Sequence, residues 1–258
     1  MKVSIIIPVY NEFRDFDEVV ERVRNAPLPA DCGKEIIVVD DGSTDGTESR
    51  VRQLSADGII VGHQSVLNFG KGTAVRIGIT LASGDIILIQ DGDLEYDPND
   101  YERIVDPIVR GEADVVYGSR FLGKPKGMAW KNLVANRILT GTANVFYKAG
   151  LTDEATAYKA FRASVLRRVQ LHCRGFEFCP EVTAKLRRLG YRIREVPITY
   201  NARGIAEGKK IRARHGLEAV WMLLKCRILP KHRCMVSVDR DRSPAVERSQ
   251  VATTAPER

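Results

Sequence analysis

Short apolar runs alternate with amphipathic segments through the first half of the chain. These runs, rich in Val and Ile, lie at residues 3–9, 35–39, 58–62, 86–89 and 114–117. Runs of this length and composition predict buried parallel strands. Between them, apolar residues recur at helical spacing, as in Phe16, Val19, Val20 and Val23. The alternation predicts an α/β protein with a doubly wound, mainly parallel sheet flanked by helices, and ligands outside the carboxyl ends of its strands.

The second half of the chain has a less regular pattern. Residues 129–148 and 178–189 read as helices, the second ending at Gly190, and residues 192–200 alternate as a strand. Residues 211–229 form an amphipathic C-terminal helix. From residue 235 to 258 the composition is rich in Ser, Arg, Pro and Thr, which predicts a disordered tail.

One strand runs directly into an acidic turn. The buried run at 86–89 is followed by Asp91, Asp93 and Glu95, spaced two residues apart and therefore on one side of an extended backbone. Hard oxygen ligands at a strand end suit Mg2+ or Mn2+, which commonly completes its shell with water and phosphate. The alternative is a solvated loop with capping aspartates, because Asp and Gly are common in turns.

Polar turns also follow the other predicted strands. They contain Tyr10 and Glu12, Asp40 and Asp41, Lys71 within Gly-Lys-Gly, and Arg120. Because parallel strand ends share one edge of a sheet, these turns predict a single cleft. Neither a complete P-loop nor a complete dinucleotide fingerprint is present, which argues against those two classes.

Composition narrows the class of protein. The 258 residues carry a formal net charge of +7, which fits an anionic partner such as phosphate, nucleic acid or a membrane surface. Five scattered cysteines indicate a reducing compartment and argue against structural zinc. No apolar run has the length of a signal peptide or the ~20 residues of a spanning helix. We therefore expect a cytoplasmic protein, soluble or peripheral on the cytoplasmic face of a membrane.

Taken together, the turns resemble the family 2 glycosyltransferases of the GT-A fold, and more narrowly the dolichol-phosphate mannose synthase type. The matching stretches are IIIPVYNE (5–12), VVDDGSTDGT (38–47), NFGKG (68–72), QDGDLEYDP (90–98), VVYGSRF (115–121), LTDEATAYKAFR (151–162) and EGKKI (207–211). The resemblance implies metal-dependent, inverting sugar transfer from a nucleotide-diphosphate sugar, such as a UDP- or GDP-sugar. It also implies a polyprenyl phosphate as acceptor, dolichyl or undecaprenyl.

The resemblance implies a role for each candidate residue. Asp91, Asp93 and Glu95 would bind the metal, and Asp93 would also be catalytic. Pro8, Tyr10, Glu12, Asp40 and Asp41 would bind the nucleotide. Lys71, Arg120, Arg203 and Lys209 would face the phosphates. Asp153 or Glu154 would be the general base if the acceptor is a hydroxyl.

Each of these residues also has an ordinary structural interpretation. Asp41 suits a turn, Lys71 a helix start, Arg120 a surface cation, and Asp153 with Glu154 a capping pair. The sequence also departs from the family pattern. Gly92 and Glu95 stand where the family commonly has Ala and Gln, and the C-terminal spanning helices of many lipid-phosphate members are missing.

The expected organisation is one catalytic domain at residues 1–234. Its nucleotide-sugar-binding half covers about 3–125, its acceptor-side half about 126–210, and the amphipathic helix about 211–229. That helix carries an apolar stripe of Leu217, Val220, Trp221, Leu224 and Ile228 among basic residues. Such a helix either lies in an anionic bilayer interface or packs its stripe on the catalytic domain.

Three alternatives to lipid glycosylation remain. The first is the same sugar transfer to a soluble hydroxyl acceptor, such as a natural-product or saccharide intermediate. The second, a nucleotidyltransferase, is disfavoured because the expected Gly-rich loop after the first strand is missing. The third, a nucleic-acid binder, is disfavoured because no recognition motif is present, so we expect no nucleic-acid partner.

Overall fold

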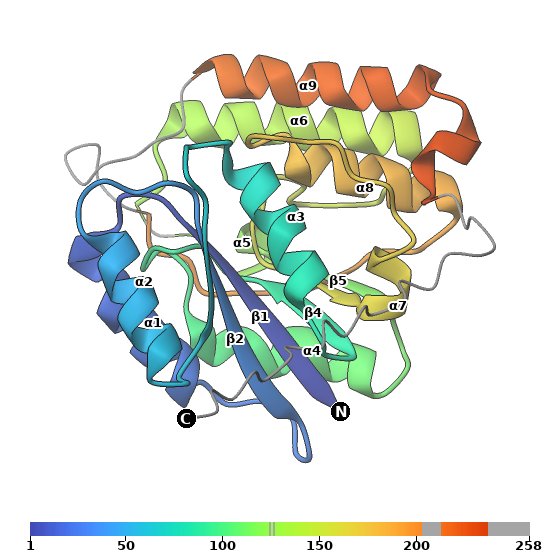
Figure 1. The fold of residues 1–258 in the computed structure, drawn as a ribbon. Coiled ribbons are helices and arrows are strands. Elements are labelled where there is room, and N and C mark those ends of the chain that lie inside the picture. The colour runs from blue at the N-terminus through green and yellow to red at the C-terminus, as the bar shows by residue number, and fades with distance from the viewer. Residues whose placement is uncertain (124, 126, 203–212, 237–258) are drawn as a thin grey trace, which may run out of the picture.

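A seven-stranded mixed sheet forms the centre of the computed structural model, which describes residues 1–123, 125, 127–202 and 213–236 (Figure 1). In spatial order the strands are β3 (Val61–Gln64), β2 (Gly33–Asp40), β1 (Lys2–Val9), β4 (Ile86–Ile89), β6 (Lys159–Arg162), β5 (Val115–Ser119) and β7 (Arg194–Pro197). The pairings are parallel except for the two made by β6. The predicted fold class is therefore confirmed.

Helices cover both faces of the sheet, which explains why the central strands β1 and β4 are apolar on both sides. On one face, β1 contributes Val3, Ile5 and Ile7 to a core with α1 (Phe13–Asn25), α2 (Thr47–Ala56) and α4 (Tyr101–Val109). On the other face, Ile6 packs with α3 (Lys71–Leu81), α7 (Ala163–Leu166) and α8 (Phe178–Leu189). Both sides of β1 are thus withdrawn from water.

A further helical layer lies beyond α8. It consists of α6 (Trp130–Tyr147) and α9 (Ala213–Ile228), which run alongside α8 at the top of Figure 1. A third cluster of buried side chains joins the three helices: Leu139, Ala143, Tyr147, Ala184, Ala219, Leu223 and Cys226. The short elements η1 (Pro98–Asp100), α5 (Arg120–Gly123) and η3 (Lys231–Cys234) complete the fold.

Two strands differ from the prediction. The third strand begins at Val61 rather than Gly58, because Gly58 has a φ of +69° in the turn after α2. Strand β6 was not predicted, since its four residues follow a polar segment and have no distinct apolar pattern. Near the C-terminus, Val236 N donates to Arg168 O at 2.9 Å, so the chain is packed up to this point. The rest of the predicted tail, 237–258, lies outside the described residues.

A buried ion pair fixes the loop that precedes α8. Glu181 and Lys185 are almost fully buried, and their charged atoms are 2.6 Å apart. The Glu181 carboxylate also accepts hydrogen bonds from the backbone N–H groups of His172, at 3.0 Å, and Cys173, at 2.7 Å. Burial alone would raise the pKa of Glu181, but these hydrogen bonds and the charge of Lys185 outweigh it and lower the pKa. The pair therefore holds residues 172–173, directly before Arg174.

We expect Glu181→Gln to lower the free energy of unfolding by about 3–5 kcal/mol, because it leaves the Lys185 charge buried without its partner. Chemical denaturation measures this, and Glu21→Gln on the exposed face of α1 is the control, expected within about 0.5 kcal/mol of wild type. The stabilisation should be complete above the ordinary carboxyl pKa of about 4.5 and lost as pH falls through the lower folded-state value. A stability gap that persists unchanged at acidic pH would contradict this account.

Candidate functional site

A cavity of about 1030 Å³ opens at the carboxyl ends of β1, β2 and β4. Four groups of residues line it. The ends of β1 and β2 contribute Pro8, Val9, Tyr10, Glu12 and Asp41; the start of α3 contributes Asn68, Phe69, Gly70, Lys71 and Ala74; the acidic turn contributes Asp91, Gly92, Asp93 and Glu95; the facing wall contributes Arg174, Gly175, Phe176, Glu177, His215, Glu218, Trp221 and Met222. A cleft is therefore present at the strand ends as expected, but Asp40 and Arg120, which were expected in it, do not line it.

Asp41 connects two parts of the cavity wall. Its carboxylate accepts hydrogen bonds from the backbone N–H groups of Phe69, at 2.9 Å, and Gly70, at 2.7 Å. Gly42 makes the same approach possible, because it has a φ of +77° and a Cβ there would lie 2.5 Å from the backbone carbon of Leu67. Asp41 thus holds the loop before α3 against the end of β2.

Asp40 has a different position from its neighbour. It is buried below the cavity and does not line it, and its Oδ1 accepts from Ser43 N at 3.1 Å and Ser43 Oγ at 2.5 Å. Burial raises the pKa of Asp40, although the Ser43 hydrogen bonds oppose the shift. The structure therefore gives Asp40 a contact within its own turn and none with the cavity.

The acidic turn forms one wall of the cavity. Lys71 Nζ donates to Asp91 Oδ1, Asp93 Oδ1 accepts from Glu95 N at 3.0 Å, and Glu95 Oε2 accepts from Tyr200 Oη at 2.7 Å. Gly92 lets the turn lie against β1, since a Cβ there would be 2.7 Å from Val9 Cγ1. Burial alone would lower the pKa of Lys71, but the negative charge of Asp91 reverses this and raises it. Lys71 is therefore a cation at this wall.

The carboxylates of the acidic turn are candidate metal ligands. Within the described part of the chain, no three His, Cys, Asp or Glu side chains are grouped closely enough to hold an ion. Asp91 and Asp93 nevertheless share the cavity wall. Mg2+ is commonly held by one or two carboxylates, with waters and substrate phosphate oxygens completing its shell. The donor set fits a two-carboxylate site, whereas Glu95 is engaged by Tyr200.

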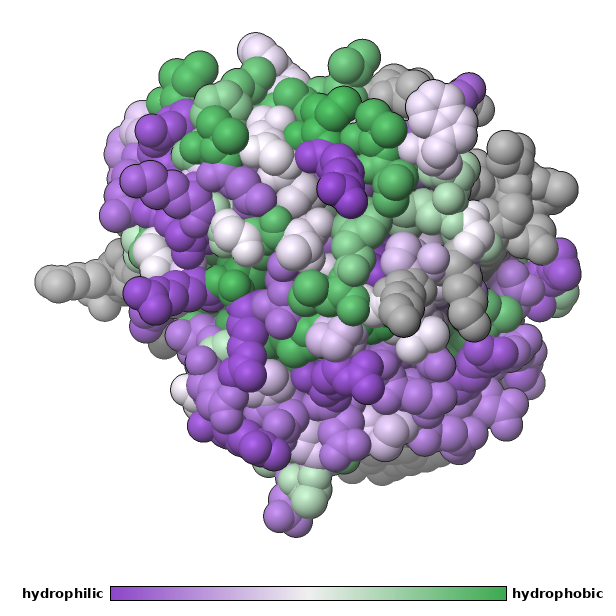
Figure 2. Space-filling view, turned by 180° about the vertical axis from the view of Figure 1, so that it is seen from behind, coloured by the Kyte–Doolittle hydropathy of each residue, from purple (hydrophilic) through white to green (hydrophobic). Residues whose placement is uncertain are grey.

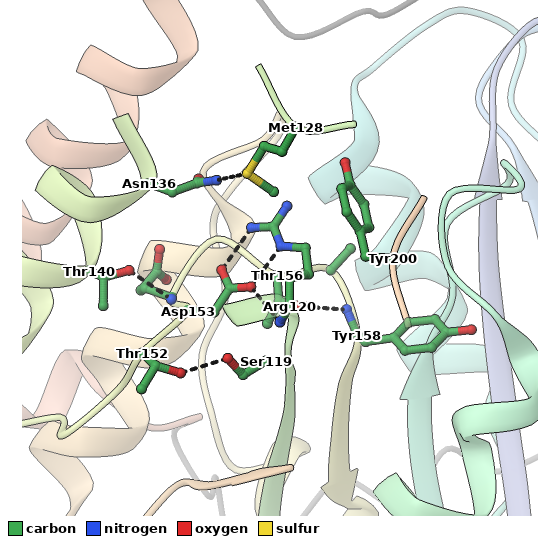
Figure 3. Close-up of polar contacts among 12 residues, drawn as sticks. Ser119, Arg120, Met128, Asn136, Thr140, Thr152, Asp153, Thr156, Tyr158 and Tyr200 are labelled. Atoms are coloured by element: carbon green, nitrogen blue, oxygen red, sulfur yellow. Dashed lines mark hydrogen bonds and ion pairs between the residues drawn. The ribbon is translucent and has the colours of Figure 1, made fainter. Parts of the chain in front are cut away.

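Arg120 and Asp153 form a buried ion pair next to the cavity (Figure 3). Asp153 accepts from Arg120 Nε and Nη2, both at 2.7 Å, and from the Arg120 backbone N at 3.0 Å. Neither residue lines the cavity. The Arg120 guanidinium lies 5.1 Å from the centre of the Tyr200 ring, and Tyr200 in turn binds Glu95. Arg120 therefore reaches the acidic wall through Tyr200, a residue that sequence reasoning missed.

Glu154 is also buried away from the cavity. Its backbone N donates to Thr140 Oγ1 at 3.0 Å, and burial raises the pKa of its carboxyl group. Neither carboxylate contacts the cavity, so the structure does not support the general-base role predicted for Asp153 or Glu154. Arg203 and Lys209, the other two predicted phosphate ligands, lie outside the described residues.

The wall facing the acidic turn was not predicted. It comes from the segment 174–177 and from α9, and the rings of Phe176 and His215 lie 4.7 Å apart. The carbonyl of Arg174 accepts from Thr73 N at 3.1 Å, which places the segment directly on the start of α3. No local sequence pattern indicates this contact, because it joins residues about 100 positions apart.

Comparison with known proteins identifies the family of the chain. The glycosyl transferase family 2 model matches residues 4–170. The chain is 30% identical over 213 residues to a dolichol-phosphate mannosyltransferase of Pyrococcus furiosus, covering 81% of this chain and 59% of the relative, so it spans well under two thirds of that protein. It is also 30% identical over 250 residues to an undecaprenyl-phosphate mannosyltransferase of Micrococcus luteus, covering 88% of this chain and 99% of the relative.

A solved structure gives the same fold. Glucosyl-3-phosphoglycerate synthase from Mycobacterium tuberculosis, in complex with Mn2+, UDP and glucosyl-3-phosphoglycerate, superposes with a TM-score of 0.68 at 22% identity, covering 89% of this chain and 81% of that one. At this identity the similarity concerns the fold. With the family model matching more than half of its length, the chain belongs to glycosyl transferase family 2.

Proposed function

We propose that the protein transfers a sugar, with inversion, from a nucleoside-diphosphate sugar to a polyprenyl phosphate, using Mg2+ or Mn2+. The observation that carries the proposal is the cavity at the strand ends, with Asp91 and Asp93 on its wall and Lys71 beside them. The names of the relatives from P. furiosus and M. luteus support the lipid-phosphate acceptor. The Mn2+ and UDP in the M. tuberculosis complex support the donor class and the metal.

Each part of the cavity then has a task toward the donor. Pro8, Tyr10, Glu12 and Asp41 lie where the nucleoside would bind, and carboxylates there accept hydrogen bonds from a base or a ribose. Asp91 and Asp93 would hold the divalent ion, which when bound offsets the charge that develops on the leaving diphosphate. Lys71 and Arg174 bring further positive charge to the same cavity.

The burial of Asp153 and Glu154 removes both predicted general bases from the cavity, and a phosphate acceptor would need neither. A hydroxyl group needs a positioned base to take its proton. A phosphate monoester has a second pKa of about 6 and is already largely ionised at neutral pH, so it needs none. Neither Asp153 nor Glu154 lines the cavity, and sugar transfer to a phosphate would not require either of them.

We further propose that α6 and α9 contact a membrane surface. Leu217, Trp221 and Ile228 of α9 are 76%, 64% and 83% exposed, and Trp130, Val134, Ile138 and Val145 form an exposed stripe on α6. Figure 2 shows apolar side chains gathered over this end of the molecule. The alternative, in which the α9 stripe packs on the catalytic domain, applies to Val220, which packs against the cluster of Ala219, Leu223 and Cys226, whereas Leu217, Trp221 and Ile228 remain exposed.

The charges around this apolar surface fit an anionic bilayer. Exposed basic residues lie on or next to both helices: Lys131, Arg137, Lys225, Arg227, Lys231 and Arg233. No helix among the described residues has the length and apolar character needed to cross a bilayer. Apolar side chains inserted at the interface and cations above them are the two components of peripheral binding.

The proposed reaction is tested by Asp93→Asn, which should lower turnover more than about 100-fold, because a metal ligand stabilises the leaving group by several kcal/mol. The assay measures released nucleoside diphosphate and labelled polyprenyl phosphate across a panel of UDP- and GDP-sugars with Mn2+ or Mg2+. Asp57→Asn, in the exposed turn after α2, is the control and should retain wild-type turnover. Full turnover in excess chelator would refute the metal requirement. Transfer confined to soluble hydroxyl acceptors would refute the polyprenyl phosphate acceptor.

Membrane contact predicts sedimentation with anionic vesicles at low salt and release as salt screens the attraction. Replacing both Leu217 and Ile228 by Glu should weaken binding at least about tenfold, since it removes apolar contacts and adds repulsion. Val61→Glu, at an exposed valine of β3, provides the same chemical change away from the two helices. Equal sedimentation of the double variant and the control would exclude α9 as the contact.

A further inference from the structure

The contact between Lys71 and Asp91 involves a residue proposed as a metal ligand. Lys71 Nζ donates to Asp91 Oδ1, and both side chains are mostly withdrawn from solvent, with exposed fractions of 23% and 18%. A divalent ion binds a carboxylate oxygen at about 2.1 Å. An ammonium group already on Asp91 would therefore repel an arriving ion at close range.

The backbone around Lys71 is fixed while its side chain is long. Lys71 is the first residue of α3, and a Cβ on the preceding Gly70 would lie 2.4 Å from the carbonyl oxygen of Arg174. Thr73 N donates to the same oxygen at 3.1 Å, so the start of α3 is held against the facing wall. The four-carbon stem of a lysine can reorient without moving such a backbone. Lys71 therefore has the freedom to change partners within the cavity.

A diphosphate in the cavity would offer that second partner. Lysine binds phosphate as a point charge, so it requires no fixed bidentate geometry. The same diphosphate would supply oxygens to a divalent ion held by Asp91 and Asp93. The diphosphate would therefore bind both Lys71 and the divalent ion. Without the diphosphate, these two cations would compete for the Asp91 carboxylate.

On the basis of the proposed function, we infer that Lys71 and the divalent ion compete for Asp91, and that the diphosphate of the donor ends the competition by binding Lys71. Lys71 thereby couples metal binding to donor binding. Alone, the ion meets an Asp91 whose charge is already offset by an ammonium group. With the donor, it meets a free carboxylate and added phosphate oxygens.

The test is a Mn2+ titration of the full chain without donor, followed by calorimetry or by the relaxation of water protons. Lys71→Met should bind Mn2+ at least about fivefold more tightly than wild type, because both the ion pair and the repulsion are removed. Lys71→Arg keeps the cation and should stay close to wild type. Arg174→Met removes a charge from the same cavity without touching Asp91 and should change Mn2+ affinity less than about twofold under physiological salt.

Linkage provides a second measurement. The factor by which a nucleoside diphosphate improves Mn2+ affinity equals the factor by which Mn2+ improves nucleotide affinity. We expect this factor to fall at least about fivefold in Lys71→Met, because part of the coupling passes through Lys71. Lys71→Gln serves as a second neutral variant if Lys71→Met unfolds at a lower temperature than wild type.

Three results would overturn the inference. They are equal or weaker Mn2+ binding by the neutral variants, no measurable Mn2+ binding by any of the proteins without donor, and an unchanged coupling factor. Equal binding would mean that the second oxygen of Asp91 accepts the ion while Lys71 remains in place. The sugar-transfer assay tests the proposed function separately. If the wild-type protein transfers no sugar but Lys71→Met binds Mn2+ more tightly, the proposed function is wrong and the competition between Lys71 and the ion for Asp91 is still supported.

Discussion

Parallel pairing of β1 with β2 on one side and β4 on the other is the constraint on which the site depends. Pro8 of β1 pairs with Val39 of β2, and Ile6 of β1 pairs with Ile89 of β4, so the three strands end within a few residues of one another. The chain must leave the sheet at this edge, where its backbone groups need polar partners. The turns at 10–12, 41–46 and 91–95 are therefore gathered at one place, and the cavity follows from that.

The carboxylates at this edge are held in a connected series of contacts. Asp91 is bound by Lys71, Glu95 by Tyr200, and Asp153 by Arg120, whose guanidinium lies beside the Tyr200 ring. A charge withdrawn from water is costly unless a partner accompanies it. Each of these three carboxylates has such a partner, and the contacts of Tyr200 and Arg120 connect Glu95 of the acidic wall to the end of β5. A change at Arg120 would consequently be felt at Glu95, although Arg120 itself does not line the cavity.

The sequence allowed prediction of the parts that depend on local pattern. The apolar runs of β1, β2 and β4 and the polar turns after them were identified because each lies within about ten consecutive residues. Strand β6 was missed because it is recruited by pairing with β4 and β5, and its four residues carry no signal of their own. Asp153 looks like a capping residue in sequence, and only its contact with Arg120, 33 positions away, reveals its burial.

The helix at the C-terminus shows the same limit in another form. The sequence predicted an amphipathic helix with a stripe of large apolar residues. It did not show whether this stripe is the face that is buried. α9 packs on α6 and α8 through Ala219, Leu223 and Cys226, and this leaves Leu217, Trp221 and Ile228 exposed. The buried face combines the small residues Ala219 and Cys226 with Leu223, so the size of the apolar side chains does not identify the face that fits against α6 and α8.

Trp221 belongs both to the exposed face of α9 and to the cavity wall. The apolar surface and the polar cavity are therefore continuous at this residue, with Met222 next to it on the same wall. An acceptor with a phosphate group and a hydrocarbon chain matches this continuity, because its charged end suits the polar cavity while its chain suits α9. A small polar acceptor would use the cavity alone and leave the exposed face of α9 without a partner. The exposure of α9 and its place on the cavity wall thus support the proposed lipid-phosphate acceptor, independently of the names of the relatives.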